Sequence, residues 1–162
     1  MLSNIRKSKE KGFTIIEVLI VLAIAGLILL VVFLAVPALQ RNARNTQRSN
    51  DVASTLGAVN EFVNNNNGAI PTTAAVAADG TLTISSTVAG TNSITTKLGY
   101  YKSGVSMTTA PGAATNSTTT DTLIIYTGSD CNAIGTQAVA GQARSIAATY
   151  TLESAAKECK AS

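Results

Sequence analysis

The hydrophobic and polar positions divide this chain into stretches of different character. Residues 1–12 are short, polar and basic, and the chain turns apolar at Phe13. Between Val18 and Leu39, 22 consecutive residues carry neither a charge nor a hydroxyl group. A helix of that length covers roughly 33 Å, which is enough to cross the hydrocarbon core of a bilayer. The pattern therefore predicts a membrane-spanning helix over 13–39, with the basic residues 1–12 on the cytoplasmic side.

The next stretch, residues 40–64, is polar but keeps a helical period. Its apolar side chains recur at the spacing of one helix face: Val52, Leu56, Val59 and Val63. Such a stripe needs a partner, which we expect to be the sheet of a C-terminal domain. The run of Asn residues before Gly68, followed by Pro71, indicates where the helix ends. One helix from 13 to about 64 would be near 78 Å long at about 1.5 Å per residue.

Three arginines, Arg41, Arg44 and Arg48, lie on another face of the same predicted helix. We expect a solvated face beside the membrane, because long cationic side chains readily extend toward water. The alternative is that these arginines contact acidic or polar groups of neighbouring subunits, or lipid headgroups.

Residues 65–162 predict a small β-rich domain. Alternating or β-branched patterns predict strands at 81–85, 122–127 and 143–153, and a possible one at 157–160. In the strand at 143–153, Ile146, Ala148, Tyr150 and Leu152 should share one face. Residues 98–102 fit either a short strand or an extended loop, and 106–120 fit an exposed loop. The predicted fold class is α+β, with an antiparallel meander packed on the second half of a long helix.

Composition argues against an enzyme. The chain has no His and only two Cys, which excludes His-based acid–base catalysis and zinc sites with the usual ligands. No metal or cofactor is expected. Of the 12 Lys and Arg, four lie in 1–12, and of the 9 Asp and Glu, one does. The remaining eight of each sign leave residues 13–162 near neutral, so nothing indicates nucleic-acid binding.

One carboxylate, Glu17, lies at the start of the apolar run, where a charge is costly and needs a partner. No Lys or Arg follows it for more than twenty residues. Cleavage after Gly12 would create such a partner, because Phe13 would then carry a positive amine four residues from Glu17. The sequence Gly12-Phe13-Thr14-Ile15-Ile16-Glu17, with its basic leader and apolar continuation, resembles the class III signal of type IV pilins and pseudopilins.

That resemblance implies a structural role. A prepilin peptidase would cut between Gly12 and Phe13, removing 1–12 as a leader peptide, and Phe13 would be N-methylated. Phe13, Thr14 and Glu17 would take part in subunit assembly, with Glu17 paired to the Phe13 amine of an adjacent subunit. The implied partners are other pilin subunits, the lipid bilayer before assembly, and an inner-membrane platform and motor. The head, 65–162, would lie outside the cytoplasm in a single-pass membrane protein and then in an extracellular pilus that serves motility, adhesion or DNA uptake.

Two further features carry expectations from the same resemblance. Filaments of the family often show the helix partly unwound between a Gly and a Pro, so Gly26 and Pro37 are candidate helix breaks, although Pro37 lies three residues later than is usual. Cys131 and Cys159 would both lie on the outer side of the membrane, where disulfides persist. We expect a structural disulfide closing a C-terminal loop, with two reduced cysteines buried in the sheet as the alternative.

Three other interpretations remain open. An ordinary secretory signal would be cut near 36–38, but its apolar region would be shorter and would lack Glu17. A pseudopilin of a type II secretion or competence system would share the N-terminal motif. Such proteins often bind calcium in the C-terminal loop, yet the nearby carboxylates are few and scattered: Asp121, Asp130 and Glu153. A membrane-anchored enzyme or binding protein has least support, because no catalytic constellation is present.

Overall fold

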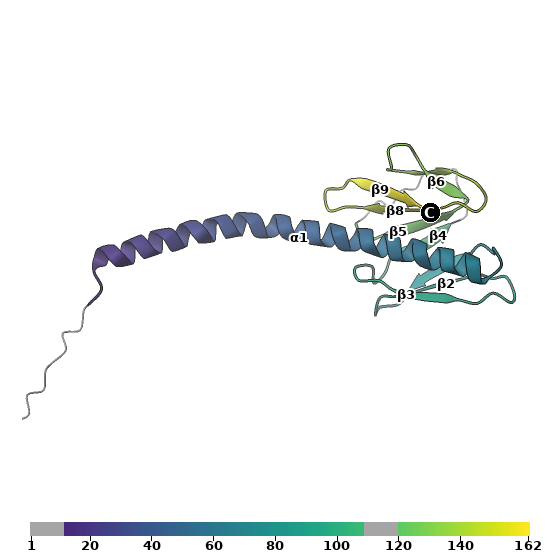
Figure 1. Ribbon diagram of the computed structural model, residues 1–162, viewed down its shortest axis with the longest axis horizontal. Helices are drawn as coiled ribbons and strands as arrows, with labels where there is room; N and C mark the ends of the chain where they lie inside the picture. Colours follow the sequence, from purple (N-terminus) through teal and green to yellow (C-terminus); the bar gives the residue numbers. More distant parts are fainter. Residues whose placement is uncertain (1–11, 109–119) are drawn as a thin grey trace, which may run out of the picture. The chain divides into compact units, whose positions relative to one another are not determined.

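The computed structural model of the chain describes residues 12–108 and 120–162. The predicted leader, apart from Gly12, and most of the predicted loop at 106–120 lie outside these residues. The chain forms two compact units, one up to Gln40 and one from Arg41 to Ser162, and each is described by itself. The predicted α+β class, a long N-terminal helix followed by small sheets, is confirmed (Figure 1).

Helix α1 runs from Ile15 to Asn65 and comprises 51 residues. In the first unit its side chains are exposed on every face, and this part is long and apolar enough to cross a membrane. The helix continues through Gly26 and Pro37 without interruption. Pro37 has no N–H, so the carbonyl of Phe33 loses its usual helical donor although the helix persists.

The second unit holds three small sheets. A three-stranded antiparallel sheet is ordered β1-β2-β3, and a four-stranded sheet is ordered β4-β5-β8-β9. Strands β6 and β7 form a two-stranded ribbon that contacts β8 and β9. The strand bounds are β1 Thr73–Val76, β2 Thr81–Ser85, β3 Ile94–Lys97, β4 Val105–Thr108, β5 Leu123–Thr127, β6 Ser129–Cys131, β7 Ala138–Ala140, β8 Ile146–Thr151 and β9 Lys157–Ala161.

The predicted antiparallel pairing of the strands at 122–127, 143–153 and 157–160 is confirmed, and one strand that was not predicted, β4, joins the edge of their sheet. Strand β4 pairs with β5 in parallel, whereas β5, β8 and β9 pair antiparallel. A parallel neighbour needs a long return connection, and the chain between Thr108 and Leu123 provides it. Because part of that connection carries few apolar residues, sequence reasoning assigned all of 106–120 to a loop and missed β4.

Strand β8 is shorter than the predicted 143–153 and is buried on both faces. A backbone turn in which the Ser145 N–H donates to the Gln142 carbonyl precedes it, and a turn at Leu152–Ala155 follows it. All six residues from Ile146 to Thr151 are buried, including Ala147, Thr149 and Thr151, which alternate with the predicted shared face. The strand is central in its sheet and is also contacted by the β6–β7 ribbon, which explains the second buried face.

The second half of α1 supplies one wall of the core. Val52, Leu56 and Val59 of the predicted stripe are buried, and Val63 packs against the same cluster while remaining partly exposed. Phe62, which the stripe omitted, is fully buried beside them. The sheets contribute Leu82, Ile84, Leu123, Ile125, Ile146, Ala148 and Tyr150 to the same core.

The buried carboxylate of Asp51 determines the conformation of residues 98–102, for which the sequence allowed either a strand or a loop. Asp51 of α1 accepts hydrogen bonds from the backbone N–H groups of Gly99, Tyr100 and Tyr101, at 2.8, 2.7 and 3.1 Å. These N–H groups point at the helix and are therefore not available to a neighbouring strand. Residues 98–102 consequently form a loop held against α1, directly after β3.

Replacing Asp51 with Ala should destabilise the second unit by about 3 kcal/mol, because three backbone donors would lose their acceptor. The measurement is the urea midpoint of the full chain in detergent, followed by near-ultraviolet circular dichroism of its tyrosines. Asp79→Ala is the matched control, because this exposed carboxylate pairs with Lys97 at the surface and should matter much less. Equal midpoints for the Asp51→Ala variant and the parent would contradict the proposed anchor.

Candidate processing and assembly site

The residues around the start of α1 form a capping box. Glu17 Oε2 accepts hydrogen bonds from the Thr14 N–H at 2.9 Å and the Thr14 hydroxyl at 2.7 Å. In return, the Glu17 N–H donates to Thr14 Oγ1 at 3.3 Å. Thr14 is therefore the N-cap residue, and its reciprocal bonds with Glu17 explain why the helix begins at Ile15. The negative carboxylate also lies at the positive end of the helix dipole.

This geometry gives Glu17 a partner that sequence reasoning missed. A charge in an apolar run suggests a positively charged partner, which is why the amine created by cleavage was expected instead. The pattern Thr-x-x-Glu before an apolar run is itself a helix-start signal and would have identified Thr14. Thr14 appeared among the expected assembly residues only through the family resemblance. In the uncut chain the carboxylate is thus already hydrogen-bonded, though not charge-neutralised.

The predicted cleavage position lies just outside the helix. Gly12 and Phe13 precede Ile15, and the Phe13 side chain is 87% exposed. A Cβ added at Gly12 would meet nothing within 4 Å. Within the described residues, nothing requires glycine at this position. A requirement for Gly12 would come from a protein that binds this segment, as expected for a peptidase substrate.

The two candidate helix breaks behave alike in the isolated chain. Both Gly26 and Pro37 lie within continuous helix, and a Cβ at Gly26 would meet nothing within 4 Å. The expected unwinding concerns the helix inside a filament, where neighbouring helices crowd it. It stays a prediction.

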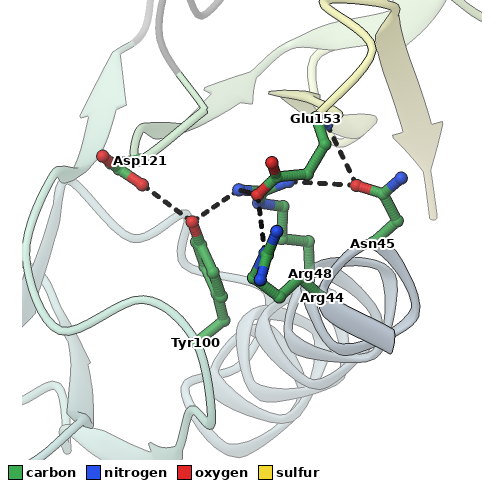
Figure 2. A network of polar contacts seen from close by, with 6 residues as sticks. All are labelled: Arg44, Asn45, Arg48, Tyr100, Asp121 and Glu153. Atoms are coloured by element: carbon green, nitrogen blue, oxygen red, sulfur yellow. Dashed lines mark hydrogen bonds and ion pairs between the residues drawn. The ribbon is translucent and has the colours of Figure 1, made fainter. Parts of the chain in front are cut away.

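The interpretation of the arginine face as solvated is wrong for Arg48 and incomplete for Arg44. Arg48 is fully buried, and one guanidinium nitrogen lies 2.8 Å from Glu153 Oε1, while Arg44 Nε lies 3.0 Å from the same oxygen. Figure 2 shows both side chains converging on Glu153. Neither a lipid nor a neighbouring subunit is needed to pair Arg48. Of the three arginines, only Arg41 is exposed as expected.

Further polar groups complete this network. Asn45 Oδ1 accepts a hydrogen bond from Arg48 at 3.0 Å and another from the Glu153 N–H at 3.0 Å. Arg48 also donates to the Tyr100 hydroxyl and lies over the Tyr100 ring, 4.3 Å from its centroid. The Tyr100 hydroxyl in turn donates to Asp121 at 2.8 Å (Figure 2). The network therefore joins α1 to the turn before β9, to the loop after β3 and to the segment before β5.

The three carboxylates weighed for calcium do not form a site. Glu153 pairs with the arginines, and Asp121 accepts from Tyr100. Asp130 Oδ1 accepts from the N–H of the next residue, Cys131. Within 12–108 and 120–162, no group of three His, Cys, Asp or Glu is placed to hold a metal ion.

Cys131 and Cys159 are joined in a disulfide. The bond connects β6 with β9, and the Cys159 N–H donates to the Gly135 carbonyl at 2.7 Å in the turn between β6 and β7. The β6–β7 ribbon is therefore fastened to the edge of the four-stranded sheet by both a covalent bond and a hydrogen bond.

Comparison with known proteins gives one match, which covers the N-terminal segment. Residues 7–33 match the model of the prokaryotic N-terminal methylation motif. Neither the curated proteins nor the solved structures include a match to the chain. The motif is the class III prepilin signal of type IV pilins and pseudopilins, which are structural proteins. Together with the apolar helix, it supports a protein of the type IV pilin or pseudopilin type.

The Glu153 network predicts a pH dependence. The hydrogen bonds from Arg44 and then Arg48 lower the pKa of Glu153 from its ordinary value. A carboxyl with a lowered folded-state pKa contributes stability above its unfolded pKa of about 4.3, and that contribution is lost as the pH falls through the folded-state value. The urea midpoint should therefore drop below about pH 4, and Glu153→Gln should flatten part of that drop.

Arg41→Gln is the control, because Arg41 is exposed and lies outside this network. Its midpoint should follow the pH profile of the parent. If the parent and Glu153→Gln lose stability in parallel between about pH 5 and pH 2, Glu153 is not a source of the acid sensitivity.

Proposed function

We propose that this chain is a structural subunit of a type IV pilus, held in the membrane by the first part of α1 and assembled into a filament through the same segment. The observation that carries the proposal is the methylation motif at 7–33 on a helix whose apolar part has no cover within the described chain. A 51-residue helix that is apolar for its first half suits a bilayer first and a filament core second.

Transfer between these two environments costs little. Side chains such as Leu19, Leu27 and Phe33 are largely exposed in the isolated chain. In a bilayer they would contact lipid, and in a filament core they would contact the corresponding helices of other subunits. Both environments are apolar, so little hydrocarbon surface would meet water during the exchange.

The capping box suggests how Glu17 is accommodated at each stage. Before assembly, the two donors of Thr14 satisfy one carboxylate oxygen, Oε2. The other oxygen has no partner in the described part of the chain. After cleavage at Gly12, the amine of Phe13 on an adjacent subunit would pair with this carboxylate and neutralise it. Because a shift of one helical turn would leave both charges unpaired in an apolar core, this pair would fix the axial register of the subunits.

The head would lie on the outer face of the membrane. A disulfide between Cys131 and Cys159 suits that compartment, because thiols there are not kept reduced. The polar network around Arg48 and the three bonds to Asp51 would fasten the head to α1, so that load on the helix is passed to a folded unit. Prepilin peptidase, an assembly platform and a motor are the partners this proposal requires.

A pseudopilin of a secretion or competence system has the same N-terminal chemistry and makes a short fibre instead of a long one. The proposal of a pilin rests on the described head, where the carboxylates weighed for calcium are engaged elsewhere or dispersed. Long fibres sheared from the cell surface, composed of this chain, would favour the pilin, whereas fibres confined to the envelope would favour the pseudopilin.

Glu17→Ala should leave cleavage and membrane insertion intact but reduce filaments to below about a hundredth of the parent level, since a lost charge pair in an apolar core costs about 3–5 kcal/mol. Processing is measured by intact mass, and filaments are counted by electron microscopy after shearing. Glu61→Ala is the matched control, because Glu61 is an exposed carboxylate of the same helix outside the apolar run.

Gly12→Leu should instead block cleavage, so that the chain is inserted in the membrane but retains its 12-residue leader. Normal filaments from Glu17→Ala would remove Glu17 from the assembly mechanism. Efficient processing of Gly12→Leu would show that the cleavage position has been assigned incorrectly.

A further inference from the structure

The C-terminal end of α1 holds the only Asn-Gly pair in the sequence, Asn67-Gly68. Asn67 has a φ of 53° and Gly68 a φ of 83°, so both lie in the left-handed region. The Gly68 N–H donates to the Val63 carbonyl at 2.8 Å, and the Asn66 N–H donates to the Phe62 carbonyl at 3.0 Å. The Gly68–Val63 bond is the 6→1 bond of a Schellman-type cap, with Asn67 at the left-handed position, whereas the Asn66–Phe62 bond is a regular helical bond.

An asparagine followed by glycine is open to an intramolecular reaction. The backbone nitrogen of Gly68 would lose its proton and attack Cγ of Asn67, forming a new C–N bond. The bond from Cγ to the side-chain nitrogen breaks, and ammonia leaves. Water then opens the resulting succinimide at either carbonyl, giving aspartate or isoaspartate. Glycine favours the attack because it has no side chain to obstruct the ring, and asparagine is accordingly among the thermolabile residues.

The reaction needs an accessible Asn67 side chain and a Gly68 nitrogen that can attack it, and the structure provides only the first. The Asn67 side chain is exposed, so water can enter and ammonia can leave. The attacking nitrogen, however, is engaged as the donor to Val63, and the left-handed backbone is fixed by the cap. We propose that Asn67 is a site of spontaneous deamidation whose rate is set by opening of the C-terminal cap of α1. This inference does not depend on the proposed function.

A neighbouring amide controls how often the cap opens. Asn66 is 9% exposed, and its Nδ2 donates to the carbonyls of Phe62 at 2.8 Å and Asn92 at 3.0 Å. Its Oδ1 accepts from the Asn92 N–H at 2.7 Å. The two bonds to Asn92 connect the end of the helix to the loop before β3, and the bond to Phe62 lies within the last turn of α1. These bonds hold the residue next to the cap, so we expect the cap to open more often when they are lost.

Either product, aspartate or isoaspartate, would destabilise the C-terminal cap of α1. Aspartate at position 67 places a negative charge at the negative end of the helix dipole. Isoaspartate adds a backbone carbon at the residue whose conformation closes the cap, so the bond from Gly68 to Val63 could not be kept. Deamidation would therefore loosen the connection between α1 and the loop that carries Asn92. In a long-lived surface protein, this change would accumulate with age.

The test compares rates of deamidation at Asn67 in the full chain in detergent, measured by peptide mapping with mass spectrometry. The folded chain should react at least about tenfold more slowly than the chain in concentrated urea, because only the opened cap is competent. Asn66→Ala should react several-fold faster than the parent while folded. Asn67→Gly should yield no product at this position and should keep the parent's circular dichroism, because glycine suits the left-handed residue.

Hydrogen exchange of the Gly68 amide provides a second measurement on the unaltered sequence. If the cap governs the reaction, low concentrations of urea should raise the exchange rate and the deamidation rate by the same factor. Equal rates of deamidation in the folded and urea-denatured chain would overturn the proposal. So would a deamidation rate that stays constant while Gly68 exchange accelerates.

Discussion

The first half of α1 presents an apolar surface that nothing in the described part of the chain covers. From Ile15 to Leu39, the side chains of α1 are exposed on all faces of the described chain. At about 25 cal/mol per Å² of apolar surface, leaving this surface in water is costly, and its length and composition are compatible with a membrane anchor. Glu17, the charged residue at the start of this segment, needs hydrogen-bond or charge partners in the same apolar environment. Thr14 supplies two hydrogen bonds to Glu17 within one subunit. The negative charge of Glu17 is not neutralised, and its proposed pairing with the amine of a neighbouring subunit would make assembly specific.

In the second unit, the part of α1 that follows Gln40 packs against the sheets through a small core. Val52, Val59 and Phe62 provide the apolar contact. Between and beside them, Arg48 and Asp51 are buried charged residues, and each is engaged by several groups. A buried ion pair is weak evidence for stability on its own, yet removal of one partner is costly. These residues therefore specify one rotation and one position of α1 against the sheets.

The long periodic features were predictable from the sequence, and the short or partner-dependent ones were not. The helix was expected over 13 to about 64 and runs over 15–65, and β2 occupies the expected 81–85. Strands β1, β3, β6 and β7 have only three or four residues, rich in Ala, Thr and Ser, and their β signal is too weak to read. The burial of Arg48 depends on Glu153, which is 105 residues away, so no local pattern could reveal it. At the N-terminus, the roles of Gly12, Phe13 and Glu17 stay predictions, and the Thr14–Glu17 capping was missed because only oppositely charged partners were expected for Glu17.

The proposed mechanism requires that the chain is cut between Gly12 and Phe13 and that the new terminus takes part in assembly. N-terminal sequencing of the native protein, combined with its intact mass, tests this most directly. The native protein should start at N-methylated Phe13, with Cys131 and Cys159 still joined. A chain that retains Met1, starts at Leu39, or starts elsewhere without the methyl group would contradict it.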